Sequence, residues 1–144
     1  MKITETRFED KLIGALRDAG FFCIHPNIMN QDGFPDLLAV TGAQVALIEV
    51  KVIEKLTAAI HSAFQPTQAP FYHNYLKSGA ASLWVAFACG GESYLCEVSP
   101  GIVKRWRELT WQKFLDSALH SWAGPPWYLA TQLRQHLRGE SWAG

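Results

Sequence analysis

The sequence predicts an α/β domain: a mixed sheet of about five strands flanked by helices, with a helical extension at its C-terminal end. One amphipathic segment precedes three short apolar segments, and a second helical segment separates these from two more. The third short segment is apolar on both faces, which is typical of a central strand. After residue 100 the apolar side chains return to helical spacing.

The first helix is expected over residues 5–19, because apolar side chains recur there every three or four positions: Phe8, Leu12, Ile13 and Leu16. Thr4 or Thr6 can cap its start, and Gly20 follows as a stop signal. Strands are expected over residues 21–25, 36–40, 45–52, 82–88 and 94–98. Residues 53–63 read as partly helical, and a further helix is expected over residues 66–77.

The composition places the chain among ordinary globular proteins, since 49% of its 144 residues are hydrophobic and 18% are charged. No apolar stretch is long enough to span a bilayer, and the N-terminal segment is too polar for a signal peptide. We therefore expect a cytoplasmic protein with no membrane partner, of a size that suits a prokaryotic or viral genome. The three cysteines lie in apolar runs without C-x-x-C spacing, so we expect reduced core thiols.

The charge is unevenly distributed, although 13 basic and 13 acidic residues balance overall. Residues 1–100 carry seven basic and ten acidic side chains, a charge of −3, and residues 101–144 carry six and three, a charge of +3. This second part also holds five of the six tryptophans: Trp106, Trp111, Trp122, Trp127 and Trp142. We expect one helix over residues 111–122 and another through Leu129, Leu133 and Leu137. These helices are expected to pack on the preceding core or at a dimer interface.

Two charged residues interrupt the third strand. Glu49 and Lys51 are two positions apart, so both point to the same face of an otherwise apolar strand. Asp36 begins the preceding strand, and a hairpin between the two strands would bring Asp36 next to Glu49. Two carboxylates there would suit Mg²⁺ or Mn²⁺, with a lysine beside them to orient a water. Alternatively, Glu49 and Lys51 simply pair with each other and Asp36 is a turn residue.

Further motifs accompany Asp36, Glu49 and Lys51 along the chain. Residues 33–36 read Gly-Phe-Pro-Asp, residues 48–52 read Ile-Glu-Val-Lys-Val, and residues 97–100 read Glu-Val-Ser-Pro. Glu9 stands eleven residues before a Gly-Phe pair, and Gln68 follows the lysine on the next helix, with Gln65 the weaker match. Together, in their order along residues 5–100, these five motifs resemble the PD-(D/E)xK nuclease superfamily. Within it they are most similar to the archaeal-type Holliday-junction resolvases and the related VRR-nuclease branch.

This resemblance implies a restriction-endonuclease-like core over residues 1–100, followed by the tryptophan-rich helical extension over residues 101–144. It implies a metal-dependent endodeoxyribonuclease that selects branched DNA and acts as a homodimer, because a two-fold dimer supplies two matched sites. The alternatives are a nuclease that processes ends, flaps or damaged duplex, and a non-catalytic binding module with the same fold. Mn²⁺ could replace Mg²⁺ as the cofactor.

The resemblance also implies roles for particular residues. Asp36, Glu49 and the Val50 backbone carbonyl would bind the metal, and Lys51 would activate water or stabilise charge on the phosphate. Glu9 would complete the site directly or through water, with Glu5 as its rival one turn earlier. Gln68 would contact the phosphate or orient Lys51.

A second candidate for DNA contact lies outside these motifs. Lys104, Arg105 and Arg107 surround Trp106, so cations could hold phosphates while a base stacks on the indole. The alternative is an ordinary solvated helix face. The five histidines share no metal-ligand spacing, and we expect them at the surface or partly buried.

Overall fold

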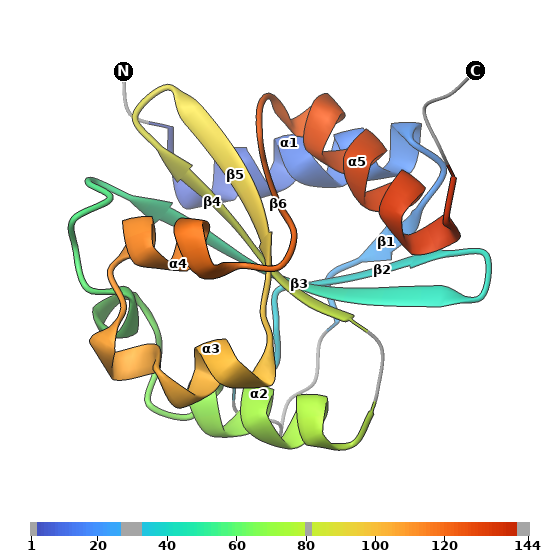
Figure 1. Cartoon of the computed structure of the whole chain (residues 1–144). Helices are drawn as coiled ribbons and strands as arrows, with labels where there is room; N and C mark the ends of the chain where they lie inside the picture. The colour runs from blue at the N-terminus through green and yellow to red at the C-terminus, as the bar shows by residue number, and fades with distance from the viewer. Residues whose placement is uncertain (1–2, 27–32, 80–81, 141–144) are drawn as a thin grey trace.

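The computed structural model describes residues 3–26, 33–79 and 82–140, and one mixed sheet forms its centre (Figure 1). Each of its six strands pairs with the next along the chain, and the β3–β4 pair is parallel whereas the other four pairs are antiparallel. The strands are β1 (Phe22–Ile24), β2 (Leu37–Thr41), β3 (Gln44–Ile53), β4 (Ser82–Cys89), β5 (Glu92–Glu97) and β6 (Ser121–Ala123).

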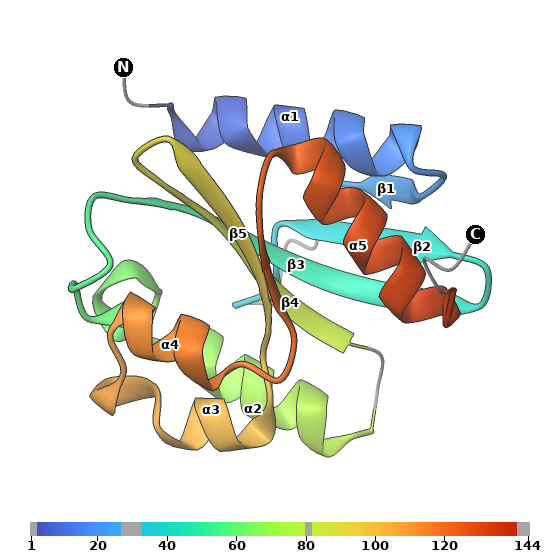
Figure 2. The same cartoon turned by 45° about the horizontal axis from the view of Figure 1, so that its top comes forward.

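Helices cover both faces of the sheet (Figures 1 and 2). On one face lie α1 (Glu5–Asp18) and α5 (Pro126–Arg138), whose leucines enter a core with Ile48, Val50 and Trp84. On the other face lie α2 (Gln68–Lys77), α3 (Pro100–Lys104) and α4 (Trp111–Ser117), which enclose a second core around Phe87. The predicted α/β class with a mixed sheet flanked by helices is confirmed.

Local sequence explains where most helices begin. The Thr4 side chain accepts a hydrogen bond from the Arg7 amide at 3.1 Å and caps α1, which was one of the two expected caps. Ser99 caps α3 in the same way, with Pro100 in the first turn. The expected helix over residues 66–77 is present from Gln68, and Thr67 occupies the cap position.

The sixth strand is a correction to the expected helix over residues 111–122. Helix α4 ends at Ser117, and Ser121–Ala123 pair with the outer edge of β5. Pairing satisfies backbone groups of β5 that an edge strand would leave open. The Trp122 indole stacks on Trp84 with ring centroids 5.4 Å apart, so its helical spacing from Trp111 was coincidental.

The partly helical segment expected over residues 53–63 contains one short 3-10 turn, η1 (Ile60–Ala63); a second such turn, η2 (Trp106–Glu108), precedes α4. Residues after 100 contribute to both cores, including Leu129 and Leu133 on one face and Trp111 on the other. The boundary drawn at residue 100 stays a prediction, and Trp142 lies outside the described residues. None of the described helices is both long and apolar enough to cross a membrane.

Candidate metal centre

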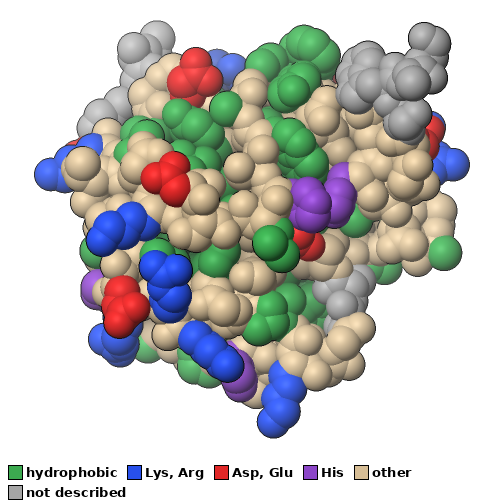
Figure 3. Space-filling view, in the orientation of Figure 1, with side chains coloured by type: hydrophobic (Ala, Val, Ile, Leu, Met, Phe, Trp, Pro, Cys, Tyr) green, Lys and Arg blue, Asp and Glu red, His purple; other side chains and the backbone are tan. Residues whose placement is uncertain are grey.

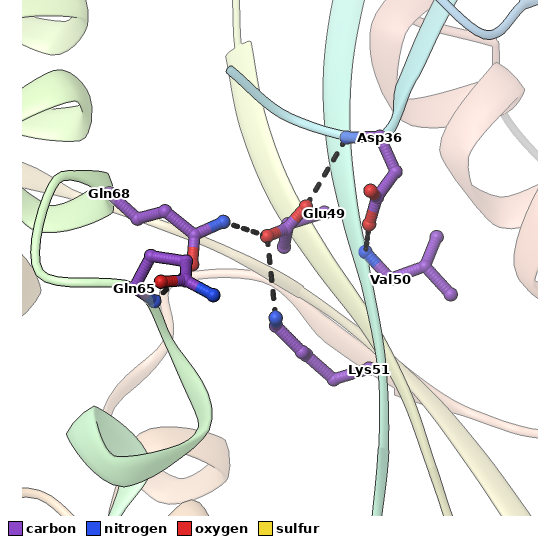
Figure 4. Close-up of polar contacts among 6 residues, drawn as sticks. All are labelled: Asp36, Glu49, Val50, Lys51, Gln65 and Gln68. Atoms are coloured by element: carbon purple, nitrogen blue, oxygen red, sulfur yellow. Dashed lines mark hydrogen bonds and ion pairs between the residues drawn. The ribbon is translucent and has the colours of Figure 1, made fainter. Parts of the chain in front are cut away.

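The centre of the candidate site is the place where β2 begins beside β3 (Figure 4). Leu37 pairs with Ile48, so the next opposed residues are Asp36 and Glu49. Asp36 Oδ2 accepts a hydrogen bond from the Val50 amide at 2.9 Å, and the Asp36 amide donates to Glu49 Oε1 at 3.2 Å. Each carboxylate therefore bonds to the backbone of the opposite strand, which draws the two acidic side chains together.

The Gly-Phe-Pro-Asp motif has a steric reason for its glycine. Gly33 has φ of +86°, and a Cβ atom there would lie 2.7 Å from the Thr67 carbonyl oxygen. The glycine thus lets the chain before Asp36 pass against the start of α2. The Phe34 ring holds the same contact, edge-on to Phe71 at 5.4 Å. This close approach brings the start of α2 next to the beginning of β2.

Gln68, the first residue of α2, extends the site from that side. Its amide nitrogen donates to Glu49 Oε2, while its amide oxygen accepts from the Gln65 backbone amide at 2.8 Å. The side chain is 5% exposed, so both ends of the amide are held inside the protein. Gln68 therefore positions Glu49 directly, whereas a contact with Lys51 had been one of its two expected roles.

Lys51 lies on the same face as Glu49, as the spacing predicted. Its Nζ is 3.6 Å from Glu49 Oε2 and 4.8 Å from the centre of the Phe64 ring. The lysine side chain keeps 17% of its surface exposed, whereas Glu49 keeps 2%. The ammonium group thus sits at the rim of the site between a buried carboxylate and solvent.

Burial of Glu49 raises the pKa of its carboxyl from 4.5 to about 9. The hydrogen bond and negative charge of Asp36 raise this pKa further, whereas Lys51 and Gln68 oppose the shift. Without a cation, the Glu49 carboxyl therefore holds a proton at neutral pH. A divalent ion would replace that proton and neutralise both carboxylates.

Helix α1 brings two more carboxylates toward Asp36. Glu9 Oε1 pairs with His25 Nδ1 at 2.8 Å, and burial followed by the charge of Asp36 raises the pKa of Glu9. Burial also raises the pKa of Glu5, with opposing contributions from Lys51 and Asp36. Both carboxylates are thus close enough to interact electrostatically with the site. Of the two, Glu9 is held in place by His25, which follows β1.

Three residues near the site have contacts that the sequence did not predict. His25 follows β1 and orients Glu9, and Phe64 lies beneath the Lys51 ammonium. Tyr72 is fully buried one turn after Gln68, and burial together with the charge of Glu49 raises the pKa of its hydroxyl well above 10. The i, i+4 spacing from Gln68 was a sequence signal for Tyr72. The other two depend on tertiary contacts.

The second candidate for DNA contact is only partly accessible. Lys104, Arg105 and Arg107 are exposed, and Figure 3 shows basic side chains over α2 and α3. Lys104 and Arg107 line a pocket with Gln65 and Pro66, which places these two cations beside the loop that leads to Gln68. Trp106 is 5% exposed and packs against Phe64 at 4.8 Å, so the expected stacking of a base on its indole is wrong.

Comparisons with known proteins agree with this arrangement at the level of the fold. The structure is similar to that of the Holliday junction resolvase Hjc from the archaeal hyperthermophile Archaeoglobus fulgidus, with a TM-score of 0.53. The match covers 89% of this chain and 98% of the resolvase, at 19% sequence identity. The chain has a restriction-endonuclease-like fold. No family model and no curated protein matches the sequence.

The residues present fit a hard divalent cation. Asp36 and Glu49 supply carboxylate oxygens, and the Val50 carbonyl lies on the strand edge that Asp36 contacts through the Val50 amide. The reciprocal bonding that holds the half-buried Asp36 beside the buried Glu49 supports this fit, because a divalent cation would neutralise two acidic side chains that lie together.

Proposed function

We propose that this chain is a metal-dependent endodeoxyribonuclease that hydrolyses phosphodiester bonds in branched DNA. The observation that carries the proposal is the reciprocal bonding of Asp36 and Glu49 across the start of β2, with Lys51 at the rim. If Glu49 and Lys51 formed only a structural ion pair, the fold would not need a second carboxylate, Asp36, bonded to the Val50 amide beside them. The fold likeness to a Holliday junction resolvase supports the same conclusion.

In this proposal Asp36, Glu49 and the Val50 carbonyl hold Mg²⁺ or Mn²⁺, with Glu9 at the far side. The bound ion supplies Lewis-acid stabilisation of negative charge on the scissile phosphate. Lys51 carries a fixed positive charge at the accessible rim, where it orients the attacking water or stabilises charge on a phosphate oxygen. Gln68 is a positioning residue, because its amide holds Glu49 from inside the protein.

The proposed substrate is a four-way junction, and the proposed assembly is a homodimer. A junction has two-fold symmetry, and resolution requires two opposed cuts that two matched sites can make. Lys104 at the end of α3 and Arg107 in η2 line a pocket with Gln65, so they add positive charge beside the site, where the phosphates of a DNA arm can lie. The finer placement near the resolvases or the VRR-nuclease branch stays a prediction.

A substrate panel tests the proposal. Labelled four-way junction, flap, duplex and single strand are incubated with Mg²⁺ or Mn²⁺ and wild type, Asp36→Asn or Lys51→Met. Both variants are expected to reduce cutting by roughly 100-fold or more. Matched controls are Asp116→Asn and Lys113→Met, which change exposed residues of α4 and are expected to cut like wild type.

The products separate the proposed activity from its alternatives. Paired nicks opposite each other across the junction support resolution, whereas progressive shortening indicates end processing. Absence of cutting with either metal, combined with tight binding of junction, would favour a non-catalytic binding module. Equal cutting by Lys51→Met and wild type would contradict the assigned site.

A further inference from the structure

A second group of ligand-type side chains lies away from the carboxylate pair. Glu97, His120 and His136 each offer one ligand atom, and these atoms all lie within 4.8 Å of one another. His120 Nδ1 is 2.8 Å from Glu97 Oε1, and the two imidazole rings have centroids 4.1 Å apart. Figure 3 shows histidine side chains gathered beside an acidic one on the surface over β6 and α5.

Three separate elements build this group. Glu97 ends β5, His120 immediately precedes β6, and His136 lies in the last turn of α5. The Glu97 amide donates to the His120 carbonyl at 2.9 Å, which fixes the backbone of the first two residues relative to each other. The His136 ring contacts the edges of Trp84 and Trp122 at 5.5 and 5.8 Å, so its orientation is also restricted.

The group is distinct from the candidate nuclease site. Trp84 pairs with both Ile48 and Glu97, so Glu97 lies two strands from β3, roughly 10 Å across the sheet. Directly paired residues share a face, so the Glu97 side chain lies on the face of Ile48, opposite to that of Glu49. No contact described for Asp36, Glu49 or Lys51 reaches it.

The chemistry of these side chains selects a class of ion. Two imidazoles and one carboxylate suit borderline transition ions, Zn²⁺ foremost, better than Mg²⁺. The ligand atoms are within a side-chain rotation of the roughly 3.4 Å that separates two ligands of a tetrahedral zinc ion.

We propose that Glu97, His120 and His136 form a transition-metal site, for Zn²⁺ or an ion of the same class, that fastens β6 and α5 to β5. A bound ion would crosslink three elements that are otherwise joined by side-chain packing and short strand pairing. The consequence is stabilisation of the C-terminal part of the fold. This inference is independent of the proposed nuclease activity, because it uses none of those residues.

Titration of the full-length protein with Zn²⁺ alone, in metal-free buffer, tests the site by calorimetry and thermal unfolding. Wild type is expected to bind one equivalent that does not depend on Glu49, and this binding is expected to raise its Tm by roughly 5–10 °C at 100 times the Kd. His120→Gln and Glu97→Gln are conservative changes of partly exposed side chains, and each is expected to weaken Zn²⁺ binding by more than about 10-fold. His61→Gln alters an exposed histidine elsewhere and is expected to bind like wild type.

Two further measurements locate the ion. The Glu49→Gln substitution removes a carboxylate from the candidate nuclease site, and this variant is expected to bind Zn²⁺ at Glu97, His120 and His136 as wild type does. Co²⁺ is expected to give visible d–d absorption and to quench tryptophan fluorescence, with less quenching in Trp122→Phe, because Trp122 lies 5.8 Å from His136. The proposal is overturned if wild type shows no saturable binding, if both ligand variants bind like wild type, or if the equivalent is lost in Glu49→Gln.

Discussion

The Glu49 carboxyl predicts a specific dependence of stability on pH. Burial and the neighbouring Asp36 raise its pKa in the folded chain from 4.5 to about 9. Between these values the folded state holds a proton that the unfolded state has released. Since the native state then binds more protons, the free energy of unfolding falls by about 1.4 kcal/mol for each pH unit. The contribution of the Glu49 carboxyl to the free energy of unfolding is fully present below about pH 4.5 and is lost progressively up to about pH 9.

The magnitude follows from that interval. Between pH 4.5 and neutral pH the loss from this one group is about 3 kcal/mol, a sizeable share of the 5–15 kcal/mol that is typical of a domain. Metal binding removes the penalty, because the ion takes the place of the proton. The candidate site is therefore expected to destabilise the metal-free protein above neutral pH and to stabilise the metal-bound one.

Glu49→Gln is the substitution that isolates this effect. The amide keeps the size of the side chain and can still accept from Gln68, and it does not titrate. It loses the acceptor that faces the Asp36 amide, a cost that does not vary with pH. Urea unfolding in the presence of a chelator, from about pH 5 to about pH 8, is expected to give a flatter dependence of stability on pH than in wild type. Glu92→Gln removes an exposed carboxyl and is the matched control.

A second arm adds Mn²⁺ at about pH 8. The unfolding midpoint of wild type is expected to rise, while that of Glu49→Gln is expected to change little. Parallel pH curves for wild type, Glu49→Gln and Glu92→Gln would refute the reasoning. A steeper curve for Glu49→Gln would refute it as well, because the carboxyl would then stabilise the fold as pH rises.

Two other substitutions test how the fold supports the site. Gly33→Ala is expected to destabilise the protein by about 1–3 kcal/mol and to weaken Mn²⁺ binding, because its Cβ would meet the Thr67 carbonyl. Gly42→Ala also has a positive φ but open space around it, so calorimetry of the two variants separates backbone strain from steric contact. Leu133→Ala on α5 is expected to lower the free energy of unfolding by about 2–5 kcal/mol, measured in urea, because Leu133 is fully buried. Leu119 is 74% exposed, and an equal loss in Leu119→Ala would contradict this.

The expected sheet depended on local signals that the tertiary structure preserved. Strands β1 to β5 follow from apolar runs separated by turn residues, and helix α1 follows from its periodicity and the Thr4 cap. The segment around Trp122 was harder to predict, because its spacing from Trp111 fits a helix as well as its residues fit a strand. What decides its structure is the open edge of β5 and the Trp84 ring, and neither is adjacent in sequence.

The candidate site divides in the same way. Asp36, Glu49 and Lys51 were accessible to prediction, because a hairpin register and a two-residue spacing place them in space. The His25 contact with Glu9 joins the end of β1 to α1, and the burial of Trp106 depends on Phe64. The histidines are separated from Glu97 by 23 and 39 positions, which no ligand-spacing motif describes. Such contacts are set by packing, which one sequence does not display.

The most direct test of the central claim is cleavage of a labelled four-way junction with Mg²⁺ by wild type and by Lys51→Met. The two proteins are compared after equal stability and equal Mn²⁺ affinity have been verified. The arrangement of Asp36, Glu49 and Lys51 predicts paired nicks by wild type and loss of cutting by the variant, because the variant retains both carboxylates but lacks the charge at the rim. Cutting by Lys51→Met at the wild-type rate, or no cutting of any branched or duplex DNA by wild type, would contradict it.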